Sequence, residues 1–132
     1  MGMVTLFRKQ IFDFTFLGVG SQTITIKRSL AIIPFYYYWL GVRVHNRVIG
    51  TGSFTLNLPN TLPSSQDPQE FTESGTPALS VQITSGTAVP SLLIDTTTFL
   101  GPYVKVTMTA TQVGAGQQLY TELSAVLFSR KP

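Results

Sequence analysis

Three basic or titratable side chains follow one another at every second position near the middle of the chain. Arg43, His45 and Arg47 lie in the stretch FYYYWLGVRVHNRV, which covers residues 35 to 48. Successive side chains of a β-strand point to opposite faces, so a strand here places all three on one face. We call these three residues the basic stripe.

The aromatic run directly before the stripe supplies large rings to both faces of the same strand. Phe35, Tyr37 and Trp39 share the face of the stripe, and the other face is apolar throughout and is predicted to be core. Gly41 lies between these three aromatic residues and the basic stripe in the sequence. A bulge at Gly41 would reverse the parity after it; without one, the three rings form an aromatic patch outside the core.

Residues that could support catalysis or hold a metal are few. His45 is the single histidine, no Gly-x-Ser-x-Gly elbow presents a serine to it, and the chain has no cysteine. Asp67, Glu70 and Glu73 do not have the spacing of a calcium-binding loop and are predicted to be a solvated acidic segment. The short glycine motifs GVGS and GAG fit hairpin turns better than phosphate loops. We therefore expect no enzyme activity, no cofactor and no metal.

The composition predicts that part of the outer surface is not exposed to solvent. Only 11% of the 132 residues are charged, whereas 43% are hydrophobic. Residues 1–50 hold six Lys or Arg against one acid, and residues 51–100 hold four acids and no cation. The simpler interpretation of this asymmetry is scattered surface charge, and the alternative is head-to-tail charge complementarity between copies of the chain. With no basic run, no leader pattern and no apolar run of bilayer length, neither nucleic acid nor a membrane is an expected partner.

Alternation with period two dominates the chain and predicts an all-β fold. The strands are expected at residues 10–17, 21–28, 35–48, 53–58, 78–84, 92–95, 103–112 and 119–129, with a further short strand at 4–7. Gly and Pro turns separate them, and no segment keeps a helical period. The prediction is an antiparallel β-sandwich of about eight strands, for which a jelly roll is one topology.

One segment interrupts this rhythm. Residues 57–77 contain four prolines and three acids and are predicted to form a long loop within a single domain spanning residues 1–132. Phe71 lies in its middle and could anchor the loop to a surface. We expect the loop to reach a neighbouring copy.

The last predicted strand is apolar on both faces near its end, where Val126 and Phe128 lie opposite the core parity. Two such double-faced strands in a chain with few charges predict an exposed apolar area, which usually marks an interface. Burial under the chain's own loop and a sugar-stacking platform remain the alternatives. The candidate interface residues are Phe35, Tyr37, Trp39, Phe71, Val126 and Phe128.

A resemblance to a known class of proteins rests on the second half of the chain. The segments LPNTLPSSQDPQEFTES, ALSVQITSG, FLGPYVKVTMTATQ and LYTELSAVLFSRK follow one another in residues 55–131. In order and texture they resemble small structural proteins of tailed bacteriophages. The resemblance implies a β-sandwich that assembles in copies on a virion, and it carries over no catalytic residue.

The sequence thus predicts a non-enzymatic virion protein, a decoration or cement component at the capsid surface. Its expected partners are further copies of itself and the major capsid protein, and a glycan is a further candidate. The alternatives are a carbohydrate- or receptor-binding module and a tail or neck subunit of a phage.

Overall fold

A computed structural model describes residues 3–16, 18–31, 36–61, 79–84, 91–100, 103–114 and 118–130. Within these ranges no helix is long and apolar enough to cross a membrane. The strands are β1 (Met3–Thr15), β2 (Gly20–Ala31), β3 (Tyr36–Ile49), β4 (Gly52–Leu58), β5 (Asn60–Thr61), β6 (Leu79–Thr84), β7 (Ser91–Leu100), β8 (Tyr103–Gln112) and β9 (Gln118–Arg130).

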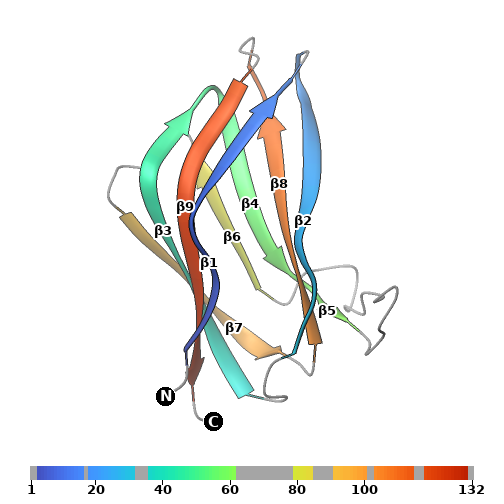
Figure 1. Ribbon diagram of the computed structural model, residues 1–132, viewed down its shortest axis with the longest axis vertical. Coiled ribbons are helices and arrows are strands. Elements are labelled where there is room, and N and C mark those ends of the chain that lie inside the picture. Colours follow the sequence, from blue (N-terminus) through green and yellow to red (C-terminus); the bar gives the residue numbers. More distant parts are fainter. Residues whose placement is uncertain are drawn as a thin grey trace.

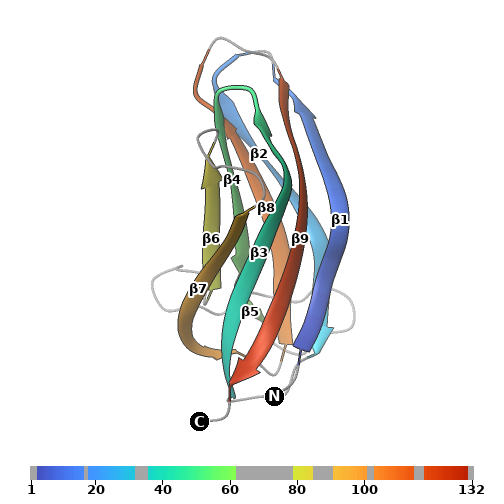
Figure 2. The ribbon, with the colours of Figure 1, turned by 90° about the vertical axis from the view of Figure 1, so that its left-hand side faces the viewer.

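The strands form two antiparallel sheets that face each other. The first sheet has the order β1-β9-β3-β7, and the second has the order β2-β8-β4-β6, with the two-residue strand β5 also pairing with β8. Figures 1 and 2 show the two layers, with β3 and β9 in the middle of one and β8 and β4 in the middle of the other. The predicted antiparallel β-sandwich is confirmed.

The order of pairing identifies the sandwich as a jelly roll. The first half of the chain pairs with the second half as one long antiparallel ribbon, in the order β1 with β9, β2 with β8, β3 with β7 and β4 with β6. The ribbon is rolled so that β9 also pairs with β3 and β8 also pairs with β4. Rolling a ribbon in this way gives the double-sheet architecture of jelly rolls.

The space between the sheets is filled by alternating apolar residues from both layers. On β3 these are Leu40, Val42 and Val44, and on β9 and β8 the side chains of the predicted inward parity are buried as well. The buried residues of β9 and β8 are Thr121, Leu123, Ala125, Leu127, Val104, Val106, Met108 and Ala110. The predicted inward parity is confirmed for these residues; the side chains of Tyr36 and Tyr38, predicted to join the core from β3, are not described, and Thr107 of β8, predicted to point outward, is buried as well.

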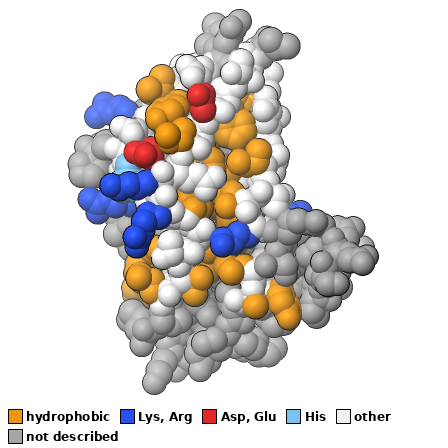
Figure 3. All heavy atoms as spheres, in the orientation of Figure 1, with side chains coloured by type: hydrophobic (Ala, Val, Ile, Leu, Met, Phe, Trp, Pro, Cys, Tyr) orange, Lys and Arg blue, Asp and Glu red, His pale blue; other side chains and the backbone are white. Residues whose placement is uncertain are grey.

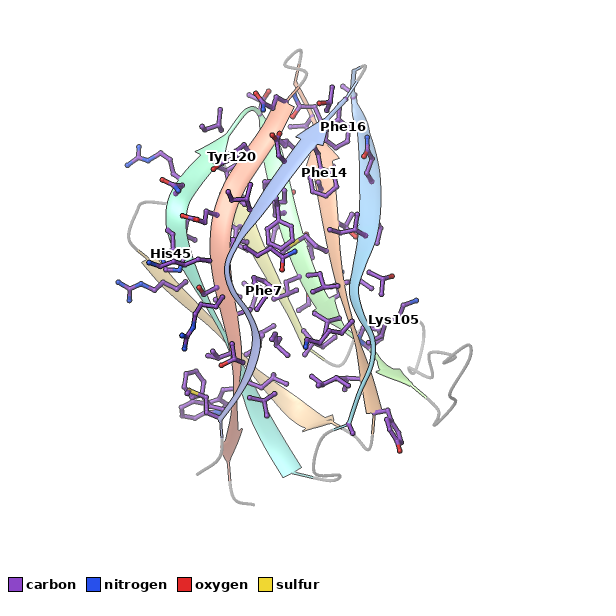
Figure 4. The ribbon with its side chains drawn as sticks, in the orientation of Figure 1. Phe7, Phe14, Phe16, His45, Lys105 and Tyr120 are labelled. Carbon is purple, nitrogen blue, oxygen red and sulfur yellow. The ribbon has the colours of Figure 1, made fainter. Side chains whose placement is uncertain are left out.

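Aromatic rings from β1 and β4 form the largest contacts in this core. Phe12 meets Phe7 edge-on, with ring centroids 5.3 Å apart, and lies 6.3 Å from Phe54. Phe14 lies 5.9 Å from Phe54 and 6.3 Å from Phe16. Figure 4 shows Phe7, Phe14 and Phe16 pointing between the sheets, whereas His45 projects from the outside of the first sheet.

Gly41 is not a bulge. Residues 40 to 42 of β3 keep an unbroken register with residues 127 to 125 of β9. The irregularities of β3 against β9 occur further along, between Val44 and Asn46 and between Asn46 and Ile49. The parity of β3 against β9 is therefore preserved through Gly41 and is disturbed within the basic stripe, whereas the pairing of β3 with β7 shifts earlier, between Tyr37 and Trp39.

Several strands differ in length from the prediction, and β2 runs three residues beyond its predicted end. β1 begins at Met3 and ends at Thr15, so it joins the predicted short strand at 4–7 to most of the one at 10–17, because a register shift between Phe7 and Gln10 lets one strand continue through the break. Within this shift Lys9 has a positive φ of 46°, a conformation that non-glycine residues rarely adopt. β7 extends to Leu100 rather than ending at residue 95.

The predicted loop at 57–77 begins inside regular structure. Residues 57 and 58 belong to β4, and Asn60 and Thr61 pair with β8. The amide of Lys105 donates to the carbonyl oxygen of Pro59 at 3.0 Å, which bridges the two short pieces. Residues 62–77, including Phe71, lie outside the described residues.

The tight turn that joins β3 to β4 depends on a glycine. Gly50 has a φ of 105°, which disfavours any residue with a Cβ. A Cβ at this position would also collide with the carbonyl oxygen of Gln118, the first residue of β9. The turn and the start of β9 are thus packed backbone to backbone.

Candidate interaction face on the first sheet

The outer face of the first sheet, which points away from the core, carries most of the side chains singled out in the sequence. It is built on β9 and β3, which pair closely along their length, with β1 and β7 at the edges. Because inward and outward residues alternate, every second cross-strand pair places two outward side chains next to each other. Two parts of this face are called the apolar half and the basic half here, and beyond the basic half Ile11, Ile49 and Tyr120 also lie on the face.

The apolar half consists of Met3, Trp39, Val126 and Phe128. Phe128 on β9 pairs with Trp39 on β3 and with Met3 on β1, so the three side chains form one row across the sheet. Trp39, Val126 and Phe128 are half-buried, whereas Met3 is 63% exposed. A row of large apolar side chains is therefore partly open to water on an ordered sheet.

Gly41 shapes the apolar half by the side chain that it lacks. A Cβ at this position would lie 2.8 Å from Cε2 of Phe128 and 3.5 Å from Cγ2 of Val126. The ring of Phe128 therefore leans across β3 into the space above Gly41. Because glycine has no side chain, the ring can lie close to the backbone of β3.

We expect Gly41→Ala to displace the ring of Phe128 while the fold survives. Alanine favours the strand over glycine by roughly 0.5–1 kcal/mol, and the half-exposed ring can turn away, so the unfolding free energy should change by about 1 kcal/mol or less. Trp39 is the only tryptophan and pairs with Phe128, so its fluorescence emission should shift. Gly20→Ala is the control because nothing lies within 4 Å of that position. Unchanged emission would contradict the contact.

The basic half consists of Arg8, Lys9, Arg43, His45 and Arg47, which flank β9 from both sides. All except the half-buried His45 are exposed. Figure 3 shows Lys and Arg side chains gathered around the single histidine on this side of the molecule. The bulge of β1 contributes the first two residues and the irregular part of β3 contributes the others.

Ser124 is the centre of the basic half. Its Oγ accepts a hydrogen bond from the backbone amide of Lys9 at 2.8 Å and shares a second one with Nε2 of His45 at 2.7 Å. The tautomer of His45 determines which partner donates in the second bond. The hydroxyl thus ties the bulge of β1 to the irregularity of β3 across the strand between them.

The serine–histidine pair joins two strands. Among the described residues, the side chain of His45 has one hydrogen bond, which is the one to Ser124. The Lys9 amide points at the serine oxygen itself, so it is not placed to stabilise an oxyanion on a substrate. The contacts that the described residues make therefore assign the pair a role in holding β1 and β3 to β9.

Two carboxylates on the same sheet are bonded to neutral amides. Asn46 donates to Oε1 of Glu122 at 2.8 Å, and Gln118 donates to Oδ1 of Asp13 at 2.9 Å. Among the described ranges no ion pair joins either carboxylate to the basic half, and no cluster of three or more metal-ligating side chains occurs. Neither carboxylate is therefore held in direct contact with a cation of the basic half.

The structure describes the side chains of only some of the predicted interface residues. Trp39, Val126 and Phe128 lie together on the outer face. The backbone of Tyr37 pairs with Arg130 and Phe99, its side chain is not described, and Phe35 and Phe71 lie outside the described residues. Sequence reasoning missed four residues of the face, and only strand pairing between distant segments could have found them. They are Met3, Arg8, Lys9 and Ser124.

Comparison with known proteins places the fold in a class and leaves the family open. No family model and no curated protein matches the chain. Among solved structures, the complex of TmCBM61 with β-1,4-galactotriose matches with a TM-score of 0.51 at 13% identity, over 89% of this chain and 69% of that one. The VP2 subviral particle of infectious bursal disease virus matches with a TM-score of 0.54 at 17% identity, over 96% of this chain and 31% of that one.

These similarities define the chain as a β-sandwich of the kind found in a viral capsid protein and in a carbohydrate-binding module. The chain spans about a third of the VP2 chain that it matches. At these identities the likeness concerns the fold alone, because one fold hosts many unrelated functions. The expected resemblance to a viral structural protein is thus supported at the level of the fold, and its tailed-phage part stays a prediction.

Proposed function

We propose that the protein is a structural component of a virion that assembles in multiple copies through the outer face of its first sheet. The apolar half carries this proposal, because a row of Met3, Phe128 and Trp39 lies partly exposed on paired strands. Large apolar side chains on a rigid surface are the usual core of a protein interface. The jelly-roll fold, shared with a capsid protein, is compatible with this role.

Within a virion, the role we propose is decoration or cementing of the capsid surface, with further copies and the major capsid protein as partners. Each copy buries the apolar half against a neighbour. Many copies bound to one shell add their contacts through multivalency, so modest single contacts suffice. A tail or neck subunit would use the same surface in the same way. The proposed work is mechanical and includes no catalysis.

We expect Trp39→Ala to weaken self-association by on the order of 2 kcal/mol, about thirtyfold in dissociation constant, as removal of an interface anchor does. The monomer should keep its fold, because Leu40, Val42 and Val44 fill the core from the same strand. Sedimentation measures the association and thermal melting measures the fold. Val19→Ser is the matched control, since Val19 is 76% exposed outside both sheets.

Two results would overturn the interface. A wild-type protein that stays monomeric up to high micromolar concentration would remove its basis. A loss of stability of roughly 3 kcal/mol or more in Trp39→Ala without an association defect would place the ring in the protein's own core.

A second candidate function is binding of a neutral glycan to the apolar half. Aromatic side chains on a flat sheet offer stacking surfaces for sugar rings, and Trp39 is half-buried with part of its surface open. In that case Trp39→Ala changes neither melting nor oligomeric state, and binding to a glycan array disappears. The single variant therefore separates the two candidates.

A further inference from the structure

We propose that the basic half of the outer face binds a sulfated glycan chain. This activity goes beyond the proposed assembly, because it uses different residues of the face. The site would consist of Arg8 and Lys9 on β1 and Arg43 and Arg47 on β3, arranged around Ser124 on β9.

The first observation is that two backbone irregularities meet at the same place. β1 shifts register between Phe7 and Gln10, and β3 shifts between Val44 and Asn46, on the two sides of β9. Bulges re-aim side chains, and an unusual backbone conformation such as the φ of 46° at Lys9 persists only where the surroundings hold it. Here the hydroxyl of Ser124 holds both strands, so the cations project from a fixed frame.

The second observation is the unbalanced charge. Among the side chains that the structure describes, four exposed cations lie nearest to one carboxylate, that of Glu122, which is bonded to Asn46, and the carboxylate of Asp13 lies further along β1. Three of the four are arginines, whose planar fork binds sulfate, carboxylate or phosphate with two parallel hydrogen bonds. A chain that carries several fixed negative charges is the ligand that complements such a surface.

The chemistry of the neighbouring side chains favours a sulfated sugar over a nucleic acid. The polar groups between the cations are an amide and a hydroxyl, Asn46 and Ser124, which suit sugar hydroxyls. The ring nearest to Ser124 is the half-buried imidazole of His45, and the next ring along β9 on this face is that of Tyr120, so a row of stacked bases would have at most one open aromatic platform here. Four cations are also fewer than the roughly 6–10 phosphate contacts of typical DNA-binding proteins.

A second copy of the chain is the competing occupant, and the test below separates it from a sugar. A second copy would need an acidic patch to match the cations. The two carboxylates whose contacts are described, Asp13 and Glu122, lie on this same sheet and are each bonded to an amide. They do not form an acidic surface that could face the basic half of a neighbour.

Heparin oligosaccharide is the probe for the test. We expect it to bind the wild-type chain at about 150 mM salt, where surface attraction beyond ~8 Å is screened. Hyaluronan, which carries carboxylates only, and a single-stranded oligothymidylate should bind at least about tenfold more weakly. The double variant Arg43→Gln/Arg47→Gln should lose about tenfold or more in heparin affinity. Arg8→Gln, on the opposite side of Ser124, should independently weaken binding.

The matched control is Lys27→Gln/Lys105→Gln, which removes the same charge from the second sheet and should leave heparin affinity within about twofold. Lys105 lies on the opposite side of the molecule from His45 (Figure 4). Melting curves confirm that each variant is folded. The proposal is overturned if wild type does not bind heparin, if both double variants weaken binding equally, or if hyaluronan or the oligothymidylate binds as tightly. It is also overturned if Arg43→Gln/Arg47→Gln abolishes self-association and spares heparin binding.

Discussion

Phe12→Ala is expected to destabilise the protein by about 3–5 kcal/mol, the range for removing a buried ring. Phe12 is 1% exposed and contacts two further rings, those of Phe7 and Phe54. Alanine leaves a cavity between the sheets that stiff neighbouring strands cannot close. Since domains of this size have only about 5–15 kcal/mol in total, the melting temperature should fall by roughly 10–20 °C.

The neighbouring residue supplies the control for this experiment. Ile11 precedes Phe12 on β1 but points outward and is 55% exposed. Ile11→Ala should change the unfolding free energy by about 0.5 kcal/mol or less. Chemical denaturation of both variants gives the comparison. Equal effects at the two positions would contradict the inward parity of β1.

Gly50→Ala is expected to cost on the order of 3 kcal/mol or more, from two causes that act together. The φ of 105° strains any residue with a Cβ, and that Cβ would strike the carbonyl oxygen of Gln118. Neither strand can yield alone, because the contact joins the β3–β4 turn to the first residue of β9. The expected result is a much lower denaturation midpoint with an unchanged denaturant slope.

Gly20→Ala tests whether this cost comes from the site or from the substitution in general. Nothing lies within 4 Å of a Cβ at Gly20, and its φ is not in the left-handed region. We expect a change within about 0.5 kcal/mol. If Gly50→Ala were equally mild, the close approach between the turn and β9 would be wrong.

The core was predictable from sequence because a sheet with one buried face imposes a period of two. Val104, Val106 and Met108 alternate with polar residues, and their burial follows directly from that alternation. The same alternation predicted that Leu123 and Leu127 of β9 point into the core and that Val126 and Phe128 point outward.

The local irregularities were not predictable, because a hydrophobic pattern does not distinguish an extra residue within one strand from a break between two strands. Leu6 and Phe7 are adjacent and both buried, which reads as a break between strands, although one strand passes through. The positive φ falls on Lys9 rather than on a glycine. These features arise from pairing with β9, which lies more than a hundred residues away.

The candidate face was half predictable for the same reason. Parity correctly placed Trp39 and Phe128 outside the core, but it could not show that they pair with each other. Nor could it bring Ser124 beside His45, because 79 residues separate them along the chain. Contacts of this kind depend on topology, which the spacing of strands alone leaves open.

The position of β9 has a consequence for how the protein is made. This strand contains residues 118–130, yet it lies in the interior of the first sheet, between β1 and β3. On the ribosome, β1 and β3 emerge long before the strand that joins them, so the first sheet forms only after about nine-tenths of these residues have been translated. Until then the phenylalanines of β1 lack their cover. Folding of the first sheet is therefore expected to be slow and to wait for β9, as for other chains dominated by distant strand pairing.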